Sequence, residues 1–159
     1  MARFSTNWPA KPDGSLVIGY GSPLRGDDAV GLRAARILAR CGCHALAVHQ
    51  LTPELAEAIA QAHTVIFVDA DARLSPGTVA VTAVDAAEVR TGAMEHHATP
   101  EALLRLAYEL YAAAPQAWRV GIGGADFGLG RRLSPAGRRG LRHALAEVAR
   151  RLTPGPLLT

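Results

Sequence analysis

Short apolar segments alternate with amphipathic ones along most of the chain, and this alternation constrains the fold more than any other feature. Five segments have the length and the β-branched or apolar content of strands: 15–20, 44–50, 63–71, 77–84 and 117–124. Four segments between or after them have helical spacing and helix-start signals: 29–40, 52–62, 99–114 and 134–152. Strands that alternate with helices pair in parallel, with helices on both faces of the sheet. We therefore predict an α/β fold with a mainly parallel, roughly five-stranded sheet.

The chain has the size and composition of one domain. It contains 159 residues, of which 49% are hydrophobic, so it can bury a core and is not disordered. We expect a loose N-terminal leader at 1–14, a single domain at 15–153 and a short tail at 154–159. No apolar run approaches the ~18 residues that cross a bilayer, and 1–14 lacks the pattern of a signal peptide. We expect a cytoplasmic protein with no membrane partner.

Charge gives little indication of a nucleic-acid partner. The net charge is only +3, although arginines gather in 130–151. This stretch has no interleaved aromatic residues on which bases could stack. The pattern is more typical of a solvated helix face, so no nucleic-acid partner is expected.

Acidic residues follow two of the predicted strands. In parallel sheets, ligands bind at the carboxyl ends of the strands. This rule selects Asp27 and Asp28, in the loop "GYGSPLRGDDAVG" at 19–31, and Asp69 and Asp71, which end the most apolar strand. A candidate site therefore lies where the first and third strands end.

The glycine-rich loop at 19–31 does not match a phosphate-binding loop. A dinucleotide loop that began at Gly19 would need glycine at position 24, which is Leu24, and a Walker loop needs a lysine that is absent from 19–31. Two aspartates at a helix start would also repel a phosphate.

The acids admit a structural and a functional interpretation. Asp27 could cap the following helix, which is usually worth ~1 kcal/mol, and Asp28 could add a favourable charge near the helix dipole. A carboxylate at Asp69 brought within ~4 Å would cost about 4 kcal/mol at an effective dielectric near 20. Such clusters persist when a proton or a cation is shared. His96 and His97 precede a helix that Thr99 would cap, so two carboxylates and an imidazole could bind a divalent metal.

Four motifs, in order, resemble those of the nickel–iron hydrogenase maturation proteases. "VIGYGSPLRGDDAVG" is similar to the family's "GxGNxLxxDDGxG" signature, and "TVIFVDA" is similar to its strand that ends in Asp-Ala. A histidine before a leucine-rich helix and "VGIGGADFGLGRRLSPA" match its later motifs. The resemblance covers most of 15–150 and implies a three-layer α/β/α sandwich.

The resemblance also implies an activity and a site. Members are endopeptidases that remove a C-terminal extension from the large-subunit precursor of a nickel–iron hydrogenase. By position, Asp28 and Asp69 would be catalytic and would bind metal with His96, His97 being the reserve ligand. The metal would be nickel supplied by the substrate. Asp27 would cap the helix and, with Gly19, Gly21 and Gly31, shape the loop.

Two departures from the family pattern keep alternatives open. Ser22 stands where the family usually has asparagine, and Gln50 stands nearest to an aspartate that many members carry after the second strand. If that aspartate acts in cleavage, this chain uses another acid or does not cleave. The alternatives are a zinc-dependent hydrolase of a small molecule and a non-catalytic escort of the hydrogenase precursor.

Overall fold

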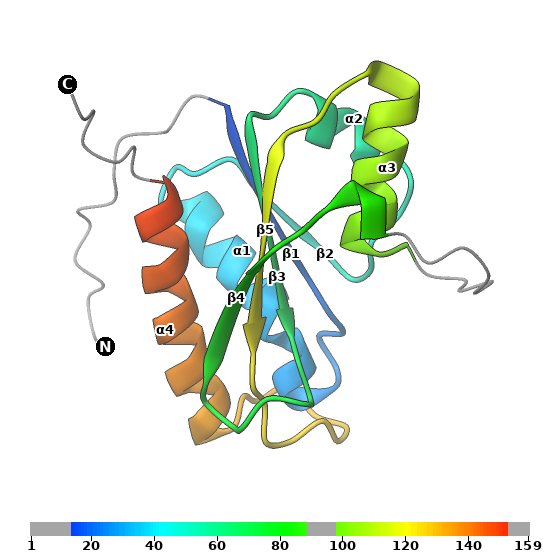
Figure 1. Cartoon of the computed structure of the whole chain (residues 1–159). Helices are drawn as coiled ribbons and strands as arrows, with labels where there is room; N and C mark the ends of the chain where they lie inside the picture. The colour runs from blue at the N-terminus through cyan, green and yellow to red at the C-terminus, as the bar shows by residue number, and fades with distance from the viewer. Residues whose placement is uncertain (1–13, 89–97, 153–159) are drawn as a thin grey trace.

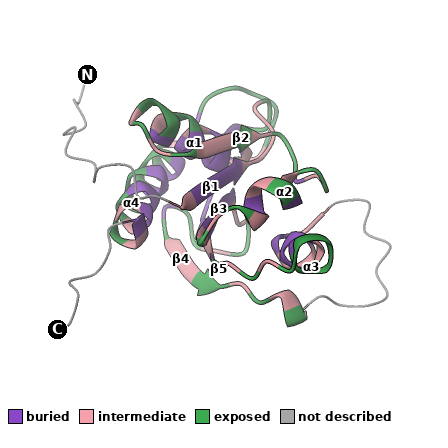
Figure 2. Cartoon of the chain, turned by 90° about the horizontal axis from the view of Figure 1, so that it is seen from above, coloured by how far each residue is buried: buried purple, intermediate pink, exposed green. Residues whose placement is uncertain are grey.

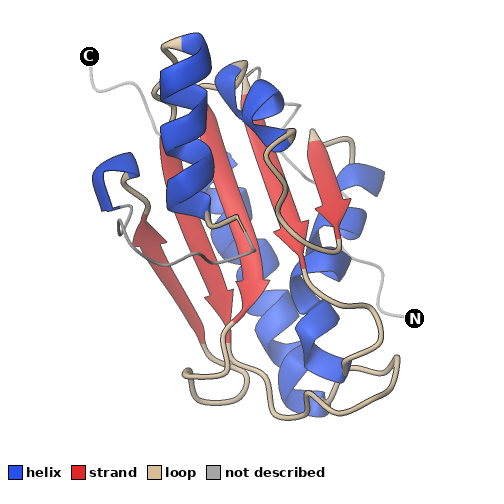
Figure 3. Cartoon of the chain, turned by 90° about the vertical axis from the view of Figure 1, so that its right-hand side faces the viewer, coloured by secondary structure: helices blue, strands red, loops and turns tan. Residues whose placement is uncertain are grey.

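The computed structural model describes residues 14–88 and 98–152. Its sheet contains five strands in the order β2-β1-β3-β5-β4. Four run parallel and β4 is antiparallel to β5, as its reversed arrow shows in Figure 3. The strands are β1 Ser15–Tyr20, β2 Ala45–Val48, β3 Thr64–Ala70, β4 Val79–Ala83 and β5 Gln116–Ile122. The predicted α/β fold with a mainly parallel five-stranded sheet is confirmed.

Helices cover both faces of the sheet and complete a three-layer sandwich (Figures 1 and 2). One face carries α1 (Val30–Arg40) and α4 (Pro135–Leu152), and the other carries α2 (Leu55–Ala60) and α3 (Pro100–Tyr111). Side chains of a strand alternate between the faces. Val17, Ile66 and Val68 therefore pack under α1 and α4, whereas the next residues along each strand pack under α2 and α3.

Helix starts match the sequence signals at two of three sites. Thr99 Oγ1 accepts a hydrogen bond from Ala102 N (3.1 Å) at the start of α3, and Ser134 Oγ accepts one from Gly137 N (2.9 Å) at the start of α4. The predicted helix at 52–62 is shorter, because α2 begins only at Leu55. Thr52 does not cap it. Its carbonyl instead accepts a bond from Leu55 N in a preceding turn.

Among residues 14–88 and 98–152, no helix combines the length and the apolar character needed to cross a membrane.

Candidate active site

Backbone hydrogen bonds join the loop after β1 to the loop after β5. A short 3₁₀ helix, η1 (Gly26–Ala29), links this first loop to α1. Gly26 N donates to Gly130 O (2.9 Å), Asp27 N to Asp126 O (2.8 Å), and Gly130 N to Leu24 O (2.9 Å). The two loops therefore form one unit beside the carboxyl ends of β1 and β3.

Asp27 fixes this unit from inside. Its side chain is fully buried, and Oδ2 accepts hydrogen bonds from Ala125 N (2.8 Å), Asp126 N (3.1 Å) and Ser134 Oγ (2.6 Å). Oδ1 accepts one from Ser134 N (2.8 Å). A buried carboxylate is tolerated only when donors satisfy it, and these donors do so.

The predicted helix cap at Asp27 is wrong. Neither η1 nor α1 has a side-chain cap, because the Asp27 carboxylate turns away from its own helix toward the β5–α4 loop. Burial alone would raise the pKa of Asp27, but the hydrogen bonds from Ser134 and the loop amides outweigh burial and hold it below its usual value. Asp27 therefore stabilises the fold as a carboxylate.

Gly31 lets α1 approach the sheet closely. A Cβ atom at Gly31 would lie 2.2 Å from Val68 O, and one at Gly19 would lie 2.0 Å from Gly31 O. Gly21 has a φ of +145°, which favours glycine, and a Cβ there would lie 1.9 Å from Asp28 O. The predicted loop-shaping glycines are thus positions where backbone segments meet, and this contact sets how near η1 lies to β3.

Asp28 points the other way from Asp27. Its side chain is half-buried, and Oδ2 accepts a hydrogen bond from Ser22 N (2.8 Å) across the loop. The bond comes from the backbone, so Ser22 supplies it regardless of its side chain. Within the described residues, Asp28 Oδ1 receives no donor.

Asp69 ends β3 next to the first loop. β1 and β3 pair in parallel with Gly19 opposite Val68, so the residues after them share one edge of the sheet. Asp69 is 7% exposed. Its Oδ2 accepts hydrogen bonds from Tyr20 Oη (2.9 Å) and Arg119 Nη2 (2.7 Å), whereas Oδ1 has one long contact, to Arg119 Nε (3.4 Å). Asp28, in η1, lies beside Gly21 just after β1, so Asp28 and Asp69 lie at the same edge of the sheet.

Tyr20 and Arg119 form one polar cluster with Asp69. Burial, followed by the negative charge of Asp69, raises the pKa of Tyr20 well above its usual value. The hydrogen bond to Asp69 raises the pKa of Arg119, although burial opposes this. Tyr20 therefore stays a neutral donor and Arg119 a cation at ordinary pH.

Sequence reasoning missed Arg119. In β5, Gly121 lies opposite Asp69, and Arg119 comes two residues before Gly121. Because side chains alternate between the faces of a sheet, Arg119 lies on the same face as Asp69 and reaches it along the strand. An arginine among the apolar residues of "AWRVGIGG" was the available signal, because a charge inside a buried strand requires a partner.

His96 and His97 lie outside the described residues. The described residues contain no cluster of three or more His, Cys, Asp or Glu side chains with the arrangement of a metal site. Gln50 is exposed after β2 at the same sheet edge, and His49 beside it is an exposed imidazole that sequence reasoning did not consider. The signal for His49 was its place at a strand end, the criterion that selected Asp69.

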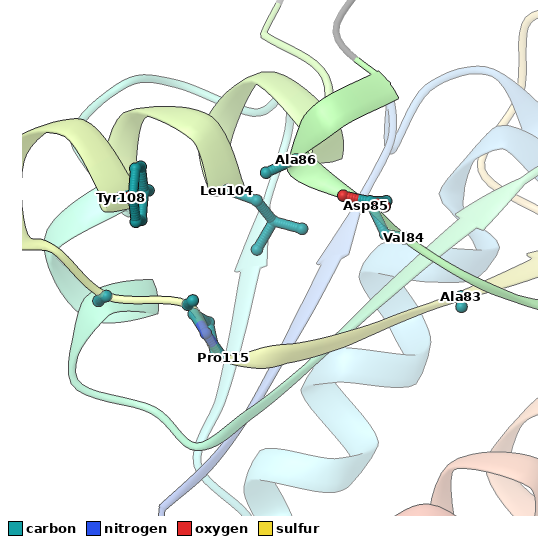
Figure 4. Close-up of a pocket in the computed structure, with 9 residues that line it drawn as sticks. Ala83, Val84, Asp85, Ala86, Leu104, Tyr108 and Pro115 are labelled. Atoms are coloured by element: carbon teal, nitrogen blue, oxygen red, sulfur yellow. The ribbon is translucent and has the colours of Figure 1, made fainter.

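Two further features lie apart from this cluster. The Asp71 carboxylate binds Arg73 (Oδ2–Nη2 2.9 Å), which holds its pKa below the usual value. A hollow of about 310 Å³ opens between α3 and the start of β5, where Leu104, Tyr108 and Pro115 line it (Figure 4). It lies at the end of the sheet opposite Asp69, and its one carboxylate, Asp85, accepts a bond from Ala87 N.

Fold and site together define a class: a three-layer α/β/α protein with carboxylates gathered at the carboxyl ends of its central parallel strands. No protein-family model matches the chain, and no curated protein matches it in sequence.

Solved structures do match it over nearly its whole length. The NiFe hydrogenase maturation protease HybD from Thermococcus kodakarensis is 26% identical, with a TM-score of 0.71 over 88% of this chain and 99% of that one. The maturation protease HycI from the same organism is 22% identical (TM-score 0.64; 87% and 91%). The hydrogenase maturating endopeptidase HybD from E. coli is 23% identical (0.57; 84% and 88%). The chain is thus a structural relative of the hydrogenase maturation proteases, which confirms the predicted resemblance and supports a peptidase.

Proposed function

We propose that this protein is an endopeptidase that removes a C-terminal extension from the nickel-loaded large-subunit precursor of a nickel–iron hydrogenase. The observation that carries the proposal is the placement of Asp28 and Asp69 at adjacent strand ends, in a fold that matches a maturation protease over 88% of the chain. Nickel arrives with the precursor, so it belongs to the substrate.

The hydrogen bonds support a choice of carboxylate oxygens for the metal in this proposal. Oδ2 of Asp28 is occupied by Ser22 N, and Oδ2 of Asp69 by Tyr20 and Arg119. Oδ1 of each carboxylate carries the weaker or no contact among the described residues. We assign Oδ1 of Asp28 and Oδ1 of Asp69 to nickel, with His96 as the third ligand and His97 as the reserve. Carboxylate and imidazole donors suit nickel.

Coordination would hold the scissile peptide bond beside the same carboxylates, and fixed orientation supplies part of the rate. In the cleavage, a water oxygen bonds to the carbonyl carbon, the C–N bond breaks, and a water proton passes to the leaving amine. Gln50 cannot exchange a proton. Asp28 and Asp69 are therefore the catalytic residues that can take that proton.

The test is the mass of a nickel-loaded precursor before and after incubation with the protein, beside a nickel-free precursor. We expect a loss of mass equal to the C-terminal extension, only with nickel. An unchanged mass in a mixture where the two proteins bind each other contradicts the peptidase and favours the escort, which Gln50 keeps as the second candidate. Stoichiometric zinc that survives dialysis of the purified protein would favour the zinc hydrolase.

The third ligand is tested by matched alanine variants. His96→Ala should abolish processing, whereas His97→Ala and His49→Ala should retain it. Loss of processing in His97→Ala alone would transfer the role to His97. Loss in His49→Ala alone would place the imidazole at the end of β2.

A further inference from the structure

A groove of about 360 Å³ lies beside the first loop, on the side of α1. We call it the arginine groove. Its apolar part is formed by Pro23, Leu24, Ala29 and Leu32, and its rim by Arg33, Arg36 and Arg131. It begins in the loop that carries Asp28, so a chain bound at the active site can reach it without crossing the molecule.

Of the apolar residues in the groove, Ala29 and Leu32 are buried and Leu24 is exposed. Leu24 is 48% exposed, in the loop between β1 and η1. Leu129, 83% exposed, precedes Gly130, whose N–H donates to Leu24 O. Leu24 therefore offers the groove an exposed apolar contact, and Leu129 adds an exposed leucine on the joined loop, outside the groove lining.

The rim carries only positive charge. No carboxylate of the described residues lines the groove, and α1 contains no acidic residue. Arg33 Nη2 donates to the Arg131 carbonyl, which fixes one side of the rim. In the described parts of the chain, Arg33, Arg36 and Arg131 take part in no ion pair. Three guanidinium groups without an ion-pair partner, placed around apolar side chains, favour a ligand with carboxylates beside an apolar residue.

We propose that the arginine groove docks an acidic segment of the hydrogenase large-subunit precursor, with an apolar side chain of that segment on Pro23 and Leu24 and its carboxylates on the rim. This inference rests on the proposed function and adds a second contact, independent of nickel. In the part of the chain that the structure describes, no aromatic side chain lines the groove for a base to stack on, which disfavours a single-stranded nucleic acid.

Two double variants with equal charge change test the groove. Arg36→Glu with Arg131→Glu reverses charge in the rim. Arg40→Glu with Arg132→Glu reverses charge at exposed arginines on the same helix and the same loop, outside the groove. Binding to the nickel-free precursor is measured for each variant and the wild type at low and high salt, after thermal melting has checked the folds. Nickel-dependent cleavage is measured separately.

We expect the rim variant to bind the nickel-free precursor about tenfold more weakly at 50 mM salt, and the difference to shrink at 0.5 M salt because exposed charges are screened. The control variant should bind within about twofold of the wild type. Equal weakening in both variants, or none in either, overturns the groove.

Two further outcomes separate this inference from the proposed function. If the wild type cleaves the nickel-loaded precursor but binds no nickel-free precursor, the groove is overturned and the function stands. If the precursor binds through the rim but is never cleaved, docking in the arginine groove is supported and the peptidase activity is contradicted. A 20-nucleotide RNA that binds more tightly than the precursor, and only through the rim, overturns the acidic peptide as its occupant.

Discussion

Two carboxylates are buried among the described residues, and their surroundings differ. Asp27 is fully buried and takes its hydrogen bonds from three backbone amides and one hydroxyl. Asp69 is nearly as buried, but its partners are a phenol and a guanidinium at the ends of side chains. Backbone amides cannot leave without unfolding the loop, whereas side chains can rotate. Asp27 is thus built to stay in place, whereas the side chains that bind Asp69 are able to move.

The largest expected effect is on Asp69. Asp69→Asn keeps the shape but removes the charge, and we expect processing of the nickel-loaded precursor to fall by about a hundredfold or more, measured by mass spectrometry. Asp71→Asn is the matched control, because Asp71 lies two residues on and pairs with exposed Arg73. Its activity should change by less than about twofold. Full activity in Asp69→Asn would show that Asp69 does not belong to the active site.

The next effect is on stability and concerns Asp27. Asp27→Asn places an NH₂ group among amide donors, so we expect the free energy of unfolding to drop by about 3 kcal/mol, measured by urea denaturation at pH 7. Asp69→Asn should cost less, since the guanidinium of Arg119 is partly exposed and water can solvate it. Equal losses in both variants would remove the distinction between the two carboxylates.

The stabilisation that Asp27 provides should also depend on pH. The folded pKa of Asp27 is lowered, so its unfolded form binds a proton first, near pH 3.9. Its stabilisation is therefore complete above about pH 5 and declines as the pH falls through the unfolded and then the folded pKa. The difference in unfolding free energy between wild type and Asp27→Asn should shrink over this range. A constant difference from pH 7 to pH 3 would mean that the pKa of Asp27 is the same in the folded and unfolded states.

A smaller effect is expected at Arg119, which we infer is a positioning residue. Arg119→Gln removes the charged donor on Asp69 Oδ2, and processing should fall by about tenfold. Arg119→Lys should recover part of it, because lysine keeps the charge but not the fork of donors. The melting temperature and the affinity for nickel-loaded precursor are followed together. A fall in melting temperature with unchanged affinity would reduce Arg119 to a structural role.

The smallest effect is expected at Ser22. Ser22→Asn restores the residue usual in the related proteases, and processing should stay within about twofold, because Asp28 is held by the backbone N–H of residue 22. A larger change in either direction would show that the side chain at position 22 contacts the substrate.

Local signals predicted most of the fold. Apolar runs of strand length gave the five strands, and Thr99 and Ser134 gave two helix starts, since capping depends on residues three positions apart. Thr52 failed as a cap, although its sequence "TPE" is the same as that at Thr99. The same three residues began a helix at one site and a turn at the other, so this local signal alone does not fix a helix start.

The candidate site was predictable in part. Asp69 followed from the rule for strand ends, and Asp28 from the motif that resembles the maturation proteases. Arg119 was not found, because its partner lies 50 positions away in the sequence. Asp27 was assigned a helix cap because a nearby helix was its only visible partner.

By itself, the sequence determined the order of strands and helices, the parallel sheet and the edge where the acids gather, because periodicity and chain connectivity suffice for these. Only the tertiary structure decided which acid of the Asp27–Asp28 pair turns inward. The donors to Asp27 lie 98, 99 and 107 positions further along the chain, in the loop between β5 and α4 that the folded structure holds beside Asp27. The role of a buried charge depends on its partners, and here distant segments supply them.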